Sequence, residues 1–141
     1  MSERGALALV SGAFFHGYLG LCVVAGAGGA LLGRRDVRLV AGFDPHEELS
    51  PRAAATLLSQ HRFLRALEAG FGVLCLRDRE RIHTEPASNR RFLALMAGGI
   101  GARVLARAAD GRPNAGAYAF GGLEAVGLAA IYAHTRTTLE R

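Results

Sequence analysis

The sequence contains no tryptophan and no lysine, and only two of its 141 residues are cysteines. A P-loop of the Walker type requires a lysine after its glycines, so this chain cannot form one. Cys22 and Cys75 stand alone in two apolar segments, which excludes a disulfide framework and a zinc motif with paired cysteines. We therefore expect both cysteines to be small buried side chains.

All seventeen basic residues are arginines, and the net charge is +5. A basic chain can bind nucleic acid, but here the arginines do not alternate with aromatic residues and no nucleic-acid motif occurs. The histidines do not form an HxxxH motif, and no motif for a nucleophile is present. We expect no nucleic-acid partner, no metal and no cofactor, and the sequence leaves enzymatic activity open, with the absence of a catalytic motif favouring a protein that is not an enzyme.

Half of the residues are apolar, and they are separated from the charges along the chain. Residues 5–33 carry no formal charge, whereas a membrane-spanning helix needs about 20 apolar residues. A signal peptide is the competing interpretation, but its apolar core of about 7–15 residues would be shorter and would follow a basic start. Residues 5–33 therefore predict a transmembrane helix.

Three further helices are predicted over residues 51–76, 92–109 and 114–135. Ser50 followed by Pro51 is a typical helix start, with the cap before the first helical residue. The charged segments 34–52 and 77–91 are predicted as loops. A tight turn at residues 110–113, formed by Asp110, Gly111 and Pro113, predicts that the last two helices form an antiparallel hairpin.

The pattern predicts an all-α fold, a four-helix transmembrane bundle that forms one domain over residues 1–141. A soluble four-helix bundle is the alternative, but each of its helices would need a polar face. Glycine pairs such as Gly29 and Gly33 are typical of close helix packing in lipid. With four spans, the termini and residues 77–91 lie on the same side of the membrane, and arginines are more frequent on that side. Because arginines are more frequent on the cytoplasmic side of membrane proteins, both termini are predicted to be cytoplasmic.

Several charges nevertheless lie within the predicted helices. Each costs about 2.5–3.5 kcal/mol at the bilayer centre on insertion scales, so we expect them to pair or to reach an interface. His61, Arg65 and Glu68 share one face of their helix, and Arg103 and Arg107 share one face of the next. The predicted cluster consists of His61, Arg65, Glu68, Arg103, Arg107 and Glu124, with Glu68 and Glu124 as counter-charges of Arg65 and Arg103.

Two functions follow from such a cluster, and the sequence leaves both open. With Arg107 counted, the cluster has a surplus positive charge and could bind a small anionic or amphipathic molecule, such as a lipid headgroup or a quinone. Alternatively, the charges fix the helix register, and the protein is a non-catalytic accessory subunit of a larger membrane complex. The expected partners are the lipid bilayer and a membrane protein or further copies of the chain.

Residues 61–134 resemble a bacterial family of membrane proteins catalogued as domain of unknown function 4345. The resemblance is carried by "RALEAGFGVLCL", "GGIGARVLARAADGRP" and "FGGLEAVGLAAIY". The residues that match the family pattern are Arg65, Gly70, Gly72, Arg103, Asp110, Gly111, Pro113 and Glu124. Glu68 and Ala69 depart from that pattern, and the first loop is longer. The resemblance implies a multi-pass protein of the bacterial inner membrane and implies no activity.

Overall fold

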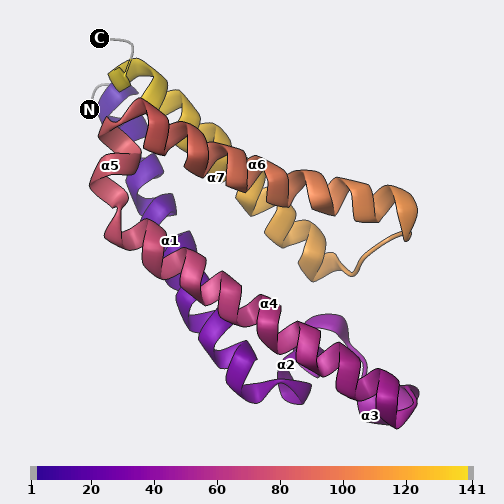
Figure 1. The fold of residues 1–141 in the computed structure, drawn as a ribbon. Helices are drawn as coiled ribbons and strands as arrows, with labels where there is room; N and C mark the ends of the chain where they lie inside the picture. Colours follow the sequence, from indigo (N-terminus) through magenta and orange to yellow (C-terminus); the bar gives the residue numbers. More distant parts are fainter. Residues whose placement is uncertain (1–2, 140–141) are drawn as a thin grey trace. The chain divides into compact units, whose positions relative to one another are not determined.

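The structure, a computed structural model, describes residues 3–139, and every regular element in that part of the chain is an α-helix (Figure 1). In chain order the helices are α1 Glu3–Leu32, α2 Arg34–Ala41, α3 Pro45–Glu48, α4 Pro51–Arg77, α5 Arg79–Thr84, α6 Pro86–Ala109 and α7 Ala115–Leu139. The all-α prediction is confirmed, and the long helices α1, α4, α6 and α7 overlap the four predicted helices.

Three of the described helices, α1, α6 and α7, are long and apolar enough to cross a membrane. The α4 helix has 27 residues, which is sufficient length, but Arg62, Arg65 and Glu68 near its middle make it too polar. By length and composition the chain is thus a membrane protein with three candidate spans among residues 3–139.

The first segment predicted as a loop, residues 34–52, is mostly helical instead. The α2 helix ends at Gly42, whose φ of 81° is in the left-handed region that favours glycine. The α3 helix follows Asp44, whose side chain accepts a hydrogen bond from the backbone N–H of His46. The loop prediction was wrong because high charge density is compatible with a short amphipathic helix as well as with a loop.

The second segment predicted as a loop, residues 77–91, is also helical over most of its length. The α5 helix occupies its first half, and α6 begins at Pro86 rather than at Phe92. Proline at the first helical position loses no hydrogen bond, because that N–H has no partner within the helix. The charged residues at the start of α6 therefore extend the helix beyond its apolar part.

The contacts divide the chain into two compact units. The α1/α4 unit contains residues 18–77, with the second part of α1 and the helices α2, α3 and α4. The hairpin unit contains the first part of α1, up to Gly17, and the described residues from Asp78 onward, with α5, α6 and α7. The expectation of a single membrane domain stays a prediction.

Within the α1/α4 unit, two glycines bring the backbones of α1 and α4 together. A Cβ atom on Gly26 would lie 2.6 Å from the backbone nitrogen of Ala69 and 2.6 Å from the carbonyl oxygen of Arg65. A Cβ atom on Gly72 would lie 2.7 Å from the carbonyl oxygen of Leu19. Neither position has room for a side chain, so the α1–α4 contact depends on glycine on both helices.

Within the hairpin unit, α6 and α7 pack against each other and against α5 and the start of α1. Buried apolar side chains from all four of these helices form its core, among them Phe15, Ile82, Phe92 and Ile131. The rings of Phe15 and Phe92 lie 5.3 Å apart between their centres. The core anchors the end of the hairpin at which α6 begins and α7 ends.

Candidate functional site

The predicted site residues of α4 surround a carboxylate that the sequence analysis missed, Asp36 of α2. The Nε2 atom of His61 lies 2.7 Å from Asp36 Oδ2, and Arg65 Nε donates to the same oxygen at 2.7 Å. Arg65 Nη1 donates to Glu68 Oε2 at 2.6 Å. We call these four residues the Asp36 cluster. The structure thus places His61, Arg65 and Glu68 on one face of α4, as the spacing predicted.

Asp36 reaches this face because the chain turns sharply between α1 and α2. The turn is at Gly33, whose φ is 47°. Gly29, one turn earlier on α1, leaves the space that the cluster fills: a Cβ atom there would lie 2.7 Å from both Arg65 Nε and Asp36 Oδ2. The side chains of Asp36 and Arg65 are only 12% and 17% exposed. The cluster is therefore largely shielded by α1, α2 and α4.

The charges of the Asp36 cluster do not favour an anion. Asp36 and Glu68 supply two negative charges, Arg65 supplies one positive charge, and His61 adds another only when it is protonated. The net charge is therefore −1 or zero. Arg65 has two carboxylate partners, so the cluster has no surplus positive charge with which to attract an anionic ligand.

Arg62, which the sequence analysis did not single out, closes the C-terminal end of α1. Its Nη1 atom donates to the carbonyl oxygens of Ala30 and Leu31, at 2.6 and 3.0 Å. The last carbonyls of a helix lack partners within the helix and carry partial negative charge. The Arg62 guanidinium therefore gives two of these carbonyls a hydrogen-bond donor and connects α4 to α1.

A second ion cluster, formed around Asp44, holds α2 and α3 together. Arg34 Nε donates to Asp44 Oδ1 at 2.8 Å, and Arg38 Nε lies 2.8 Å from Asp44 Oδ2. The hydrogen bond from Arg34 lowers the pKa of Asp44 to about 2, with smaller contributions from the His46 backbone N–H and the charge of Arg38. The same hydrogen bond raises the pKa of Arg34. Burial by itself would raise the pKa of Asp44, but the lowered pKa keeps this carboxylate ionised across the physiological range.

In the hairpin unit, Arg103 of α6 and Glu124 of α7 form the ion pair that the sequence predicted. Arg103 Nε donates to Glu124 Oε2 at 2.7 Å, and Nη2 donates to Oε1 at 3.0 Å. This bidentate geometry is the strongest that a guanidinium and a carboxylate can adopt. The Glu124 side chain is 9% exposed and that of Arg103 is 44% exposed. The pair joins the two helices of the hairpin.

Arg107 lies apart from this pair, in the last turn of α6, where it is exposed. Cations are favourable at that end of a helix, and a long side chain there can reach the membrane surface. The membership of Arg107 in the predicted charge cluster stays a prediction. The union of this pair with the Asp36 cluster in a single cluster stays a prediction.

The turn between α6 and α7 occurs where the sequence placed it. The backbone N–H of Asp110 donates to the carbonyl oxygen of Ala106, which closes α6. Gly111 follows with a φ of 99°, a conformation that side chains rarely permit, and Pro113 precedes α7. The conformation required at Gly111 explains why a glycine stands in the turn.

Histidines and aromatic rings meet in the hairpin unit. The His83 ring lies 4.8 Å from that of Phe15 and 6.3 Å from that of His134. Among residues 3–139, no group of three histidine, cysteine, aspartate or glutamate side chains is arranged to hold a metal ion. Cys22 and Cys75 are both buried, as predicted.

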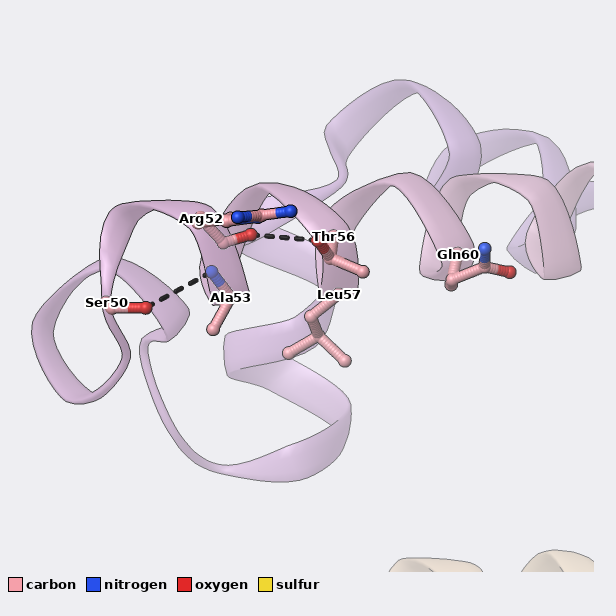
Figure 2. A pocket seen from close by; sticks show the side chains of 6 residues that line it. All are labelled: Ser50, Arg52, Ala53, Thr56, Leu57 and Gln60. Carbon is pink, nitrogen blue, oxygen red and sulfur yellow. Dashed lines mark hydrogen bonds between the residues drawn. The ribbon is translucent and has the colours of Figure 1, made fainter.

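Among the hollows in the described part of the chain, two lie at the ends of long helices. One, of about 590 Å³, lies along the start of α4 (Figure 2) and is lined by Ser50, Arg52, Ala53, Thr56, Leu57 and Gln60. Ser50 Oγ accepts from the Ala53 N–H and Thr56 Oγ1 donates to the Arg52 carbonyl oxygen, so both hydroxyls serve the helix itself. The second hollow, of about 240 Å³, lies where α6 begins and α7 ends.

Comparisons with models of protein families, with curated proteins and with solved structures found no match for this chain. The resemblance to the family catalogued as domain of unknown function 4345 stays a prediction. The site consists of ion pairs that join helices in each unit.

Proposed function

We propose that this protein is a multi-pass integral membrane protein of the bacterial inner membrane, with α1, α4, α6 and α7 as its spans. The observation that carries the proposal is the exposure of its apolar helices. Only 22%, 11% and 17% of the most apolar windows of α1, α6 and α7 is buried. Exposing such faces to water costs about 25 cal/mol of free energy per Å² of apolar surface, whereas contact with lipid avoids this cost.

The α4 helix is included as the fourth span because its charges are compensated locally. Arg65 is paired with Asp36 and Glu68, and Arg62 binds the carbonyls at the end of α1. Charged residues in spans are tolerated when they face the protein interior and pair there. A helix of 27 residues is about 40 Å long, which exceeds the hydrocarbon thickness of about 30 Å. Four spans would leave both termini on the arginine-rich, cytoplasmic side.

For its role, we propose a non-catalytic accessory subunit whose ion pairs are structural. Each pair joins two helices: Arg65 with Asp36 connects α4 to α2, and Arg103 with Glu124 connects α6 to α7. The alternative, an anionic ligand bound at these arginines, would have to displace carboxylates already at 2.6–2.7 Å. The same motifs that carry the resemblance support assignment to the family catalogued as domain of unknown function 4345.

Alkaline carbonate extraction of membranes from cells that express the tagged chain tests the first proposal. An integral protein stays in the pellet, and recovery in the supernatant would refute membrane integration. Fusions of green fluorescent protein to either terminus test the span number, because this reporter fluoresces in the cytoplasm and not after export in unfolded form. Fluorescence from both fusions supports four spans, whereas fluorescence from only one would refute them.

Purification in a mild detergent tests the accessory role. We expect the chain to elute with one partner in a fixed ratio, and the complex to dissociate in a harsh detergent that leaves the chain helical. Elution of the chain alone, from membranes that also contain its native neighbours, would refute the accessory role and leave membrane integration intact.

A further inference from the structure

The short helix α2 exposes an apolar side chain that no proposed span accounts for. Leu39 is 85% exposed, which is the largest exposed fraction among the large apolar side chains of the described residues. It lies between α1 and α4, outside every helix proposed above as a span. Lipid contact along a span therefore does not explain why this leucine is exposed, and its position requires a separate explanation.

Contacts within the α1/α4 unit fix which face of α2 turns outward. Arg34 and Arg38 both bind Asp44, at 2.6 and 2.8 Å. Val37 is only 3% exposed, so its side of the helix faces the protein. Leu39 follows two residues later, and residues two apart in a helix point to nearly opposite sides. The side of α2 that carries Leu39 is therefore held outward.

This outward face combines apolar side chains with one guanidinium group. Arg35 precedes Leu39 by four residues, so the two share a face of the helix. Arg35 is exposed and makes no ion pair among residues 3–139. Val40, next to Leu39, is 48% exposed and widens the apolar part. We call Arg35, Leu39 and Val40 the outward face of α2.

The α2 helix cannot lie far from the membrane surface if α1 crosses the bilayer. The candidate span of α1 ends at Leu32, and α2 begins at Arg34, directly after the turn at Gly33 (Figure 1). The eight residues of α2 extend over about 12 Å, and the headgroup layer is about 5–8 Å thick. Leu31 and Leu32 are 79% and 54% exposed. Exposed apolar surface thus continues from the end of the span onto α2, within reach of the headgroups.

We propose that α2 lies in the plane of the membrane surface as an anchor, with Leu39 and Val40 among the upper acyl chains and Arg35 on an anionic headgroup. In-plane helices bury an apolar face about 5–10 Å deep and place basic residues against the headgroups. Arginine suits this position, because its stem contacts apolar surface while its guanidinium binds phosphate oxygens with two parallel donors. An isolated helix of eight residues would bind a membrane weakly, but α1 holds α2 there. This step rests on the proposed membrane integration.

A single tryptophan can test this position, because the chain contains none. The full chain with Leu39→Trp is reconstituted in phosphatidylcholine vesicles. We expect bromine near the headgroup end of the acyl chains to quench its fluorescence more strongly than bromine near the chain ends, since the apolar face lies about 5–10 Å deep. Glu48→Trp is the matched control, because Glu48 is exposed on the next helix, α3. Its tryptophan should be quenched by aqueous iodide and not by brominated lipid.

The in-plane position is refuted if brominated lipid quenches Leu39→Trp no more than Glu48→Trp. It is also refuted if neither iodide nor brominated lipid quenches Leu39→Trp, because a protein surface would then cover the outward face. If circular dichroism shows that Leu39→Trp does not fold, Leu39→Cys takes its place. A water-soluble maleimide should label Leu39→Cys more slowly in vesicles than Glu48→Cys, and equal rates would refute the position.

The same fluorescence tests the headgroup contact of Arg35. Quenching by brominated phosphatidylglycerol and by brominated phosphatidylcholine gives the relative affinity of the two lipids at the outward face. We expect about a fivefold preference for phosphatidylglycerol, because an arginine near an anionic surface contributes about that factor. Arg35→Gln in the Leu39→Trp chain should abolish the preference. Arg112→Gln, which changes an exposed arginine in the turn between α6 and α7, is the matched control and should retain it.

Equal affinity for the two lipids, or a preference that survives Arg35→Gln, would refute the headgroup contact. Carbonate extraction of the same variants separates this inference from the proposed function. If the variants stay in the pellet while the tryptophan of Leu39→Trp behaves as in water, α2 is not an anchor and membrane integration stands. Recovery of the variants and of the unchanged chain in the supernatant would refute membrane integration, and the in-plane position with it.

Discussion

The ion pair between Arg103 and Glu124 should respond asymmetrically to the loss of either partner. Glu124→Gln leaves an arginine that is 44% exposed and can turn toward solvent or headgroups. Polar contacts between helices in membranes contribute about 0.6 kcal/mol on average and at most about 1.7 kcal/mol. We therefore expect this variant to lower the free energy of unfolding by about 1 kcal/mol.

Arg103→Gln should have the larger effect, because it leaves a carboxylate that is only 9% exposed without its guanidinium. Removal of one partner from a fully buried pair costs about 3–5 kcal/mol, and the partial exposure of this pair reduces the figure to about 2–3 kcal/mol. Unfolding in mixed detergent micelles, followed by circular dichroism, measures both variants. The double variant then gives the coupling energy, which we expect to be about 1 kcal/mol.

Arg107→Gln is the control on the same helix, one turn further on, and it should change stability by no more than about 0.5 kcal/mol. The structural interpretation would be wrong if Glu124→Gln and Arg107→Gln had equal, negligible effects. It would also be wrong if the effect of Glu124→Gln exceeded that of Arg103→Gln, since burial would then not determine the cost.

Three further predictions concern the α1/α4 unit. Gly26→Ala should lower the melting temperature strongly, because its Cβ would meet the backbone of α4 at 2.6 Å. Gly28→Ala is the control: open space surrounds Gly28, so this variant should raise the melting temperature or leave it unchanged. The stability that Asp44 contributes should be present above about pH 4, the pKa of an unfolded aspartate, and be lost as the pH falls towards 2. In an acid titration followed by circular dichroism, the stability of Asp44→Asn should therefore depend less on pH than that of the unchanged protein. Cys22 and Cys75 should react with a water-soluble maleimide only after denaturation, and rapid labelling of the native protein, measured by mass, would contradict their burial.

Some of the site followed from the sequence because it depends on the geometry of single helices. The spacing of Arg65 and Glu68 places them on one face of α4 in any fold, since helix periodicity is constant. The pairing of Arg103 with Glu124 followed from a short turn that forces α6 and α7 to be antiparallel, together with the high cost of an unpaired charge. Both inferences needed only local geometry and the physics of charge burial.

The other contacts could not be predicted, because they join segments whose distance in space depends on the turns between them. Asp36 meets His61 and Arg65 only because the chain turns at Gly33, and nothing in the residues themselves fixes the direction of that turn. The same holds for the capping of α1 by Arg62.

The sequence by itself determined the helical class, the positions of the long helices and the apolar character that marks a membrane protein, since these depend on hydropathy and on the 3.6-residue period. The tertiary structure decided which glycines form the helix contact. Gly26 and Gly72 do so, and Gly29 instead gives space to the charged side chains of Arg65 and Asp36. A glycine permits close approach wherever it occurs, but only the path of the neighbouring helix determines whether a backbone or a side chain takes up the space.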